Sequence, residues 1–340
     1  MSEDPFRGVL VPALTPFRSD LSPDADAFVT HCRWLLDRGA DGLAVFGTTS
    51  EANSIGLDER LELLEHLIEC GISPNMLMPG TGTSALTDTV RLTAHAVEKG
   101  CAGVLMLPPF YYKAVDDDGL FASYSEVIQR VGSDSLRVYL YHIPPVAKVP
   151  LSLELIGRLL KEYEGTVVGL KDSSGDWHNT EAVLKAYPSL ATFCGSEVFL
   201  LNTLRAGGAG SITATANVNI VPIRGVYERW QEKEVGELQK KINAVRKAFE
   251  GYATIPAMKA IIAQYYDSPQ WCTVRPPLQP LHPNDTQLLR DTLTQLGFEM
   301  CVNPAVRRTN FSPPALRWLR PERGYRQRDP TDCSSPPHCG

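Results

Sequence analysis

The sequence lacks several features that mark whole classes of protein. Its 340 residues contain no apolar run close to the roughly 20 residues of a membrane-spanning helix, and no basic-then-apolar stretch typical of a secretory signal stands at the N-terminus. Basic residues are also outnumbered: the chain has 33 Lys and Arg against 39 Asp and Glu, which gives a formal net charge of −6. Nucleic acids and anionic membrane surfaces attract basic patches, so we expect neither as a partner.

Paired cysteines are missing as well. The chain has eight cysteines but no C-x-x-C pair, a distribution that fits neither a zinc site nor a small disulfide framework. We therefore expect reduced thiols in a cytoplasmic protein. The eight are Cys32, Cys70, Cys101, Cys194, Cys272, Cys301, Cys333 and Cys339.

What the sequence does contain is a regular alternation of short apolar runs and amphipathic segments. Hydrophobic residues make up 43% of the chain and charged residues 21%, which is typical of a globular protein with ample core material. Runs that are apolar at consecutive positions are typical of strands buried on both faces, as in parallel sheets. The runs cover residues 9–17, 42–49, 75–82, 103–110, 137–144, 166–174, 191–197 and 208–218.

The spacing of these runs predicts the fold. Amphipathic segments such as 24–40 and 57–71 carry a glycine at or near their C-terminal ends, placed like a helix C-cap, and the early spacing of roughly 30 residues is that of a βαβ unit. Eight even units favour an α/β fold of the closed (β/α)8 TIM-barrel type over an open, doubly wound sheet. We expect residues 1–225 to form the barrel and 226–301 a C-terminal helical extension. Residues 302–340 are rich in Pro and Arg and aperiodic, which predicts a disordered or atypical tail.

Lys171 is the most informative single residue. It ends the run "VVGLK", and catalytic groups of barrels lie at the carboxyl ends of strands. The lysine either marks the exit of the strand into solvent or lies buried, and the apolar residues before it and the hydroxyl-bearing "DSSG" after it favour burial. Burial lowers the pKa of an amine, and a neutral amine can attack a ketone to form a Schiff base. Other lysines, such as Lys148 and Lys259, follow prolines or lie in helical patterns, and we interpret them as surface residues.

A Schiff-base lysine needs a group that moves protons. Tyr141 ends the fifth run, "YLYHIPP", so its phenol can act as the acid and base; the alternative is an aromatic core residue. Tyr139 lies on the same face but farther from the loop, and His142 points to the opposite face, where we expect a structural role.

Two loops allow more than one interpretation. In "GTTSE" (47–51) the hydroxyls and backbone N–H groups suit either a carboxylate or the N-cap of the next helix. The motif "GTGTSA" (80–85) matches a dinucleotide fingerprint, but the next strand leads into Pro108 and Pro109 in place of the required acidic residue, so we interpret it as a barrel loop. The glycines of 208–218 suit a phosphate or a close backbone approach, and the absence of a basic residue there favours the second.

Taken together, these motifs resemble the dihydrodipicolinate synthase / N-acetylneuraminate lyase superfamily of class I, pyruvate-binding aldolases. The resemblance covers residues 6–300 and implies a (β/α)8 barrel with a C-terminal helical part, assembled as a homotetramer that is a dimer of dimers. The motifs that carry it are "GVLVPALTPF", "GTTSEANS", "PPFYYK", "YHIPP", "VVGLKDSSGD" and "GGAGSITATANV".

The resemblance also implies roles for particular residues. Lys171 matches the lysine that forms an imine with the keto carbon of pyruvate, and Tyr141 matches the general acid and base. Thr48 and Thr49 match positions that hold the pyruvate carboxylate and, in the synthases, join a proton relay. The same relay receives a tyrosine from a neighbouring subunit, which is matched by Tyr112.

Further positions bear on the substrate. Ile212 matches the residue whose backbone carbonyl faces the lysine, and Ser173 lies where it can contribute to specificity. Val146 stands where the synthases carry an arginine for the carboxylate of the second substrate, and the loss of that charge-assisted bond, worth about 1.5–3 kcal/mol, disfavours the synthase reaction. Lys148 is near enough to substitute in part. Ser50 replaces a usual glycine and is expected to narrow the site, and "KDSSGD" departs from the sialic acid lyases.

We expect a lyase or aldolase that cleaves or forms a 2-keto-4-hydroxy acid, such as a 2-keto-3-deoxy sugar acid, through a pyruvate–lysine imine. The iminium is the electrophile, so we expect no metal or other cofactor. Three alternatives stay open: a dehydratase that expels a β-hydroxyl through the same imine, a synthase with another carboxylate anchor, and a non-catalytic protein that binds a keto acid.

Overall fold

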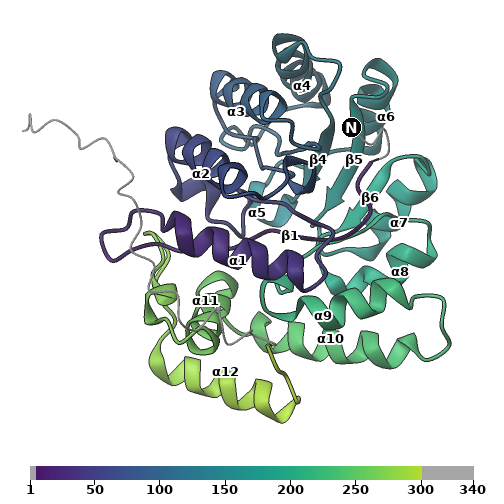
Figure 1. Ribbon diagram of the computed structural model, residues 1–340. Coiled ribbons are helices and arrows are strands. Elements are labelled where there is room, and N and C mark those ends of the chain that lie inside the picture. The colour runs from purple at the N-terminus through teal and green to yellow at the C-terminus, as the bar shows by residue number, and fades with distance from the viewer. Residues whose placement is uncertain (1–4, 301–340) are drawn as a thin grey trace, which may run out of the picture. The chain divides into compact units, whose positions relative to one another are not determined.

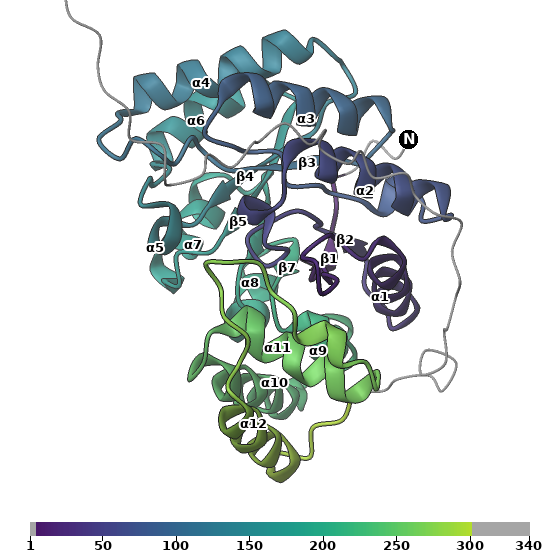
Figure 2. The same cartoon turned by 90° about the vertical axis from the view of Figure 1, so that its left-hand side faces the viewer.

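The computed structural model describes residues 5–300 and has an α/β architecture built on one curled, parallel sheet. Seven strands are hydrogen-bonded in the order β2-β1-β7-β6-β5-β4-β3, so consecutive strands lie side by side around most of the sheet (Figures 1 and 2). The strands are β1 (Gly8–Val11), β2 (Gly42–Leu43), β3 (Val104–Met106), β4 (Val138–His142), β5 (Val167–Asp172), β6 (Ala191–Cys194) and β7 (Gly210–Ile212).

Residues 77–80 connect the two edges of this sheet. Leu77 bridges Leu43 of β2, and Gly80 bridges Leu105 of β3, so the segment lies between the two edge strands. The sequence predicts a full strand over 75–82, but the structure forms only isolated bridges there. Pro79 accounts for part of the difference, because its carbonyl accepts from the Leu105 amide at 2.9 Å while its own nitrogen has no proton to donate in return. The fold is TIM-barrel-like, with eight hydrogen-bonded segments.

Helices cover the outer face of the sheet (Figure 1). The two helices predicted within 24–40 and 57–71 are present, and each is followed by a glycine with positive φ, Gly39 at 97° and Gly71 at 90°. The covering helices are α1 (Ala25–Asp37), α2 (Leu57–Glu69), α3 (Leu86–Glu98), α4 (Asp117–Val131), α6 (Leu153–Glu162), α7 (Trp177–Ala186), α8 (Leu200–Arg205) and α9 (Ala216–Glu228).

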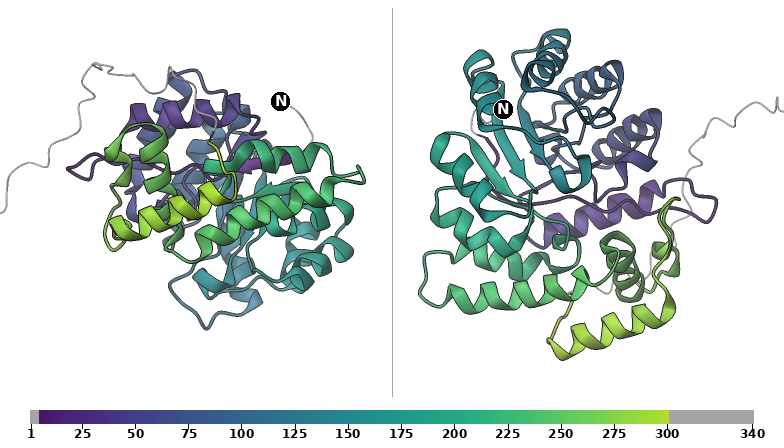
Figure 3. Two further views of the ribbon diagram at one scale, coloured as in Figure 1. Left: turned by 90° about the horizontal axis from the view of Figure 1, so that it is seen from below. Right: turned by 180° about the vertical axis from the view of Figure 1, so that it is seen from behind.

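Three further helices follow the last strand unit: α10 (Val235–Glu250), α11 (Thr254–Tyr265) and α12 (Pro283–Gln295). α10 packs along α9, and α11 and α12 pack against each other and against α10 on one side of the sheet (Figure 3). A short helix, α5 (Pro144–Ala147), follows β4, and 3-10 turns occupy Ala52–Ser54, Pro74–Met76, Glu197–Phe199 and Pro269–Cys272. The predicted tail, 302–340, lies outside the residues that the structure describes. Within residues 5–300, no helix is long and apolar enough to cross a membrane.

The core has two parts, because successive residues of each strand point to opposite faces. Leu140 of β4 joins the large outer cluster between sheet and helices, whereas Tyr139 and Tyr141 join a smaller cluster enclosed by the sheet. At one end of the inner cluster, the Tyr139 phenol accepts a hydrogen bond from the Phe6 amide at 2.8 Å, and burial raises the pKa of Tyr139 to about 12. The inner cluster therefore lies inside the curled sheet and extends from Tyr139 to Tyr141 at the carboxyl end of β4.

Candidate active site

Lys171 and Tyr141 meet inside the sheet at the carboxyl ends of two neighbouring strands. They are register partners on β5 and β4, so their side chains leave the backbone at the same level and on the same face. The Lys171 Nζ lies 3.1 Å from the Tyr141 phenol oxygen and 4.2 Å from the centre of its ring. Only 4% of Lys171 is exposed. The predicted burial of Lys171 and its predicted proximity to Tyr141 are thus both observed.

Thr48 approaches the same phenol from the loop after β2. Its Oγ1 lies 3.4 Å from the Tyr141 oxygen, and either hydroxyl can be the donor. Thr48 and Tyr141 line a small pocket together with residues of the 80–85 loop and with Asn53, a polar residue that sequence reasoning missed because it lies just beyond "GTTSE". The lining consists of Phe46, Gly47, Thr48, Ala52, Asn53, Gly80, Gly82, Leu105, Leu107 and Tyr141.

The surroundings of Tyr141 change its acidity. Burial by itself raises the pKa of the phenol, but the positive charge of Lys171 and hydrogen bonds from Thr48, Lys171 and Ser173 outweigh it, so the pKa of Tyr141 falls below its ordinary value of 10.0. A phenol of lowered pKa gives up its proton more readily, so Tyr141 can act as an acid and, once deprotonated, as a base toward a group bound at the nitrogen 3.1 Å away.

The turn that follows Lys171 is fixed by a buried carboxylate that sequence reasoning did not single out. Asp172 accepts hydrogen bonds from the Ser174 amide at 2.8 Å, the Asn179 side chain at 2.9 Å and the Thr180 hydroxyl at 2.7 Å. On the same outer face, His142 accepts from the Leu151 amide at 3.0 Å, and burial lowers its pKa. The predicted structural role of His142 agrees with this contact.

The "GTTSE" turn is held from outside the pocket. The Ser50 hydroxyl donates to the Ala13 carbonyl at 2.6 Å and is buried, so it joins the turn to the segment after β1. The Glu51 carboxylate forms an ion pair with Lys259 of α11. The exposed fraction of Lys259 is 0%. The interpretation of Lys259 as a surface residue is therefore wrong: its helix is apolar around it, and its partner comes from a distant loop. Lys148, by contrast, is exposed as expected.

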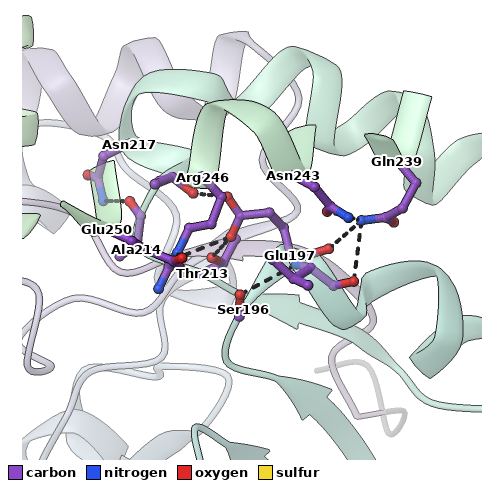
Figure 4. A network of polar contacts seen from close by, with 11 residues as sticks. Ser196, Glu197, Thr213, Ala214, Asn217, Gln239, Asn243, Arg246 and Glu250 are labelled. Atoms are coloured by element: carbon purple, nitrogen blue, oxygen red, sulfur yellow. Dashed lines mark hydrogen bonds and ion pairs between the residues drawn. The ribbon is translucent and has the colours of Figure 1, made fainter. Parts of the chain in front are cut away.

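A second buried carboxylate, Glu197, organises the loops after β6 and β7 (Figure 4). It accepts hydrogen bonds from the hydroxyls of Thr213 and Thr215 and lies 3.7 Å from the Arg246 guanidinium of α10. Gln239, also on α10, donates to the Glu197 carbonyl at 2.8 Å. This network ties the carboxyl end of the sheet to the C-terminal helices, and its partners lie too far apart in sequence to be found by pattern.

The remaining predicted site residues lie around this centre at varying depth. Ile212 is fully buried at the end of β7, and Thr49 is partly exposed next to Thr48. Val146 is 60% exposed on α5, and Tyr112 is 73% exposed with its ring 5.3 Å from that of Tyr111. The structure therefore places these two at the surface, and the roles that the resemblance implies for all four stay predictions.

Comparisons with known proteins agree with this geometry. Residues 5–296 match the model of the dihydrodipicolinate synthetase family. The chain is 36% identical to an uncharacterized DapA-like lyase of Chloroflexus aurantiacus, over 84% of this chain and 95% of that protein. The solved dihydrodipicolinate synthase from Agrobacterium tumefaciens superposes with a TM-score of 0.80 at 34% identity, covering 85% and 99% of the two chains. A variant of the 2-keto-3-deoxygluconate aldolase of Sulfolobus solfataricus shares the fold, with a TM-score of 0.77 at 20% identity, covering 85% of this chain and 96% of that one.

Proposed function

The chain belongs to the dihydrodipicolinate synthetase family of class I pyruvate-dependent lyases and aldolases, and we propose that it cleaves or forms a 2-keto-4-hydroxy acid through an imine on Lys171. One observation carries the proposal: the Lys171 Nζ is buried and lies 3.1 Å from a phenol of lowered pKa. The proposed framework is a closed (β/α)8 barrel over residues 1–225 with the helices of 226–301 as an extension.

The first steps build the imine. The neutral Lys171 amine attacks the 2-keto carbon, and the Tyr141 phenol protonates the new alkoxide. The resulting phenolate takes the extra proton from the attached nitrogen and passes it to the same oxygen, which leaves as water while the nitrogen lone pair forms the protonated imine. Tyr141 is then a phenolate, and the Thr48 hydroxyl, 3.4 Å from its oxygen, is placed to donate a hydrogen bond to it. Thr49, with Thr48, is proposed to hold the carboxylate of the substrate.

The next steps use the iminium as an electron sink. The Tyr141 phenolate removes the proton of the C4 hydroxyl, the C3–C4 bond breaks, and its electron pair moves into the iminium, which yields an enamine and an aldehyde. Protonation of the enamine at C3 and hydrolysis of the resulting imine release pyruvate and restore Lys171. The reverse sequence is an aldol addition.

Residues at the rim are proposed to complete the site. Tyr112, 73% exposed in one chain, is proposed to reach the relay of a neighbouring subunit in a homotetramer. Ile212 is proposed to turn its carbonyl toward the lysine, and Ser173, whose hydroxyl bonds to Tyr141, is proposed to contact the substrate. Val146 itself does not supply the cation that recognises a carboxylate in the synthases.

The synthase reaction is a second candidate, and a particular contact favours it. The Lys113 ammonium bonds to the Phe110 carbonyl and, at 3.1 Å, to the Ala147 carbonyl next to Val146. A cation is therefore present at this turn although residue 146 does not supply it. The 34% identity to the Agrobacterium tumefaciens synthase supports the same reading.

Product analysis separates these candidates. The protein is incubated with a panel of 2-keto-3-deoxy sugar acids, and separately with pyruvate and aldehydes that do or do not carry a carboxylate. Free pyruvate from the first set indicates the lyase, whereas a dehydrated keto acid without pyruvate indicates a dehydratase. Condensation only with the carboxylate-bearing aldehyde, lost in Lys113→Met, indicates the synthase. If none of these reactions occurs, the proposed function is wrong.

A further inference from the structure

The loop that carries Thr48 has an unusual anchor in the C-terminal helices. Glu51, three residues after Thr48, is buried and has a positive φ of 58°, a conformation that costs free energy for a residue with a side chain. One of its carboxylate oxygens accepts from the Lys259 ammonium, and the other accepts from the Arg275 amide at 3.1 Å. Both partners belong to the region that follows the barrel.

Lys259 is satisfied on every side by this arrangement. Besides Glu51, its ammonium donates to the Thr273 carbonyl at 3.0 Å and lies 4.5 Å from the centre of the Phe17 ring. Burial lowers the pKa of Lys259 to about 8, and the Glu51 carboxylate opposes that shift. Each member of the pair therefore needs the other, because an unpaired charge at this depth is costly.

The anchor leads directly to the catalytic hydroxyl. The Glu51 amide donates to the Thr48 carbonyl at 3.2 Å, and the amides of Ser50 and Ala52 both donate to the Gly47 carbonyl, so backbone hydrogen bonds link Glu51 to Thr48 within one turn. The contact between the Thr48 hydroxyl and the Tyr141 phenol is already long at 3.4 Å. A displacement of the turn by a fraction of an ångström breaks it.

We propose that Glu51 and Lys259 are positioning residues of the active site: the buried ion pair sets the "GTTSE" turn so that Thr48 meets Tyr141, which makes the C-terminal helices part of the catalytic unit. The expected effect on catalysis rests on the proposed function, because it is measured as pyruvate binding at Lys171. Its structural half, the anchoring of residues 47–52, does not depend on the reaction.

The experiment compares four proteins: wild type, Lys259→Met, the double variant Glu51→Gln/Lys259→Met, and Arg224→Met. The last is the matched control, because it removes an ion pair with Asp41 at the amino end of β2, the opposite end of the sheet from Lys171. Two quantities are measured: the pyruvate concentration that half-saturates borohydride trapping, and the hydrogen exchange of the backbone amides of 47–55 and 167–172.

For Lys259→Met we expect the half-saturating pyruvate concentration to rise by about tenfold or more, since small misplacements of binding groups have effects of this size. Exchange should increase in 47–55 while 167–172 stays protected. The double variant leaves no unpaired buried charge and should recover stability but not pyruvate binding, which separates positioning from folding. Arg224→Met should leave the half-saturating concentration within about twofold of wild type.

The outcomes are distinguishable. If the double variant is half-saturated at the wild-type pyruvate concentration, the inference is wrong even though the proposed function stands. If wild type is not trapped by pyruvate at all, the proposed function fails, and the exchange data alone decide the anchor: unchanged exchange over 47–55 in both Lys259 variants overturns it, and increased exchange confined to that segment supports it.

Discussion

Within residues 5–300, two lysines are buried, Lys171 and Lys259, and their surroundings differ in a way that separates reactivity from structure. Lys171 lies near the carboxyl end of β5, and its nitrogen faces the hydroxyl and the ring of Tyr141. Lys259 lies within a helix, and its ammonium faces a carboxylate and a carbonyl. Both are removed from water, but only Lys171 has a phenol as its partner, and that phenol lines a pocket together with Thr48.

The chemical nature of the partner, more than burial itself, decides what a buried amine does. A carboxylate keeps an amine charged, and a charged amine is not a nucleophile. A phenol can give up a proton and take one back, so it can serve a reacting amine as both acid and base.

Tyr141→Phe removes the proton-exchanging partner and keeps the ring. We expect kcat to fall about 10²- to 10⁴-fold, the usual contribution of a general acid and base. The free energy of unfolding should fall by about 1–3 kcal/mol, because the buried Lys171 nitrogen loses its hydrogen-bond partner while the ring packing is kept. Steady-state kinetics with the substrate found by product analysis gives the measurement. A kcat equal to that of wild type would mean that another group moves the protons.

Lys259→Met tests the other side of the contrast. Breaking a buried ion pair while leaving one charge behind typically costs about 3–5 kcal/mol of the free energy of unfolding. Lys171→Met, by comparison, leaves no carboxylate unpaired and should be far less destabilising. Urea denaturation of both variants compares them directly. Equal losses for the two lysines would contradict the distinction drawn here.

The pair of Lys171 and Tyr141 could be predicted from the sequence because the signals that place it are local. Strand period and strand ends place Lys171 and Tyr141 on one face, and the structure confirms that they meet. Lys259 was misassigned because its partner Glu51 lies 208 residues away in the chain. A signal was nevertheless present: Lys259 is the only charged residue of α11, whose composition "TIPAMKAIIAQY" is apolar on all sides, a pattern typical of a buried helix.

Other parts of the fold also followed from pattern, with informative exceptions. The segment 75–82 was predicted as a full strand, yet Pro79 interrupts the donors of its ladder. Asp172 and Glu197 were not singled out, because the hydroxyls and amides that they bind come from other turns and, for Glu197, from a helix beyond the barrel. Buried carboxylates that organise loops depend on tertiary contacts, which periodicity does not report.

His31 offers a pH test in the same region as Lys259. It is buried between the Tyr266 hydroxyl, 2.9 Å from Nδ1, and the Asn217 side chain, 3.0 Å from Nε2, and burial lowers its pKa from 6.5 to about 4 despite the opposing bond from Asn217. The unfolded chain therefore takes up this proton at a higher pH than the folded chain. The stability that this group contributes is complete above pH 6.5 and is lost as pH falls toward 4.

The expected loss is about 3 kcal/mol across that window. Urea denaturation at several pH values is compared with the same series for His31→Phe, which removes the titrating group while the carboxylates common to both proteins stay. The variant should show a flatter dependence between pH 4 and 6.5. Identical slopes for the two proteins would mean that His31 is protonated in the folded state.

The smallest effect is expected for an exposed lysine on the helix that follows β5. Lys185 of α7 pairs with Glu181 at 3.0 Å, one turn away, and the lysine side chain is mostly in solvent. Lys185→Met should change the free energy of unfolding by less than about 0.5 kcal/mol and leave pyruvate trapping unaltered. A larger change would show that charge on this face matters for reasons other than burial.

The most direct test of the central claim is to treat the wild-type protein with borohydride in the presence of pyruvate and to map the modified residue by mass spectrometry. A reduced pyruvate adduct on Lys171, present in Lys259→Met and absent from Lys171→Ala, is the predicted result. An adduct that persists in Lys171→Ala, or a wild-type protein that forms none, would contradict it.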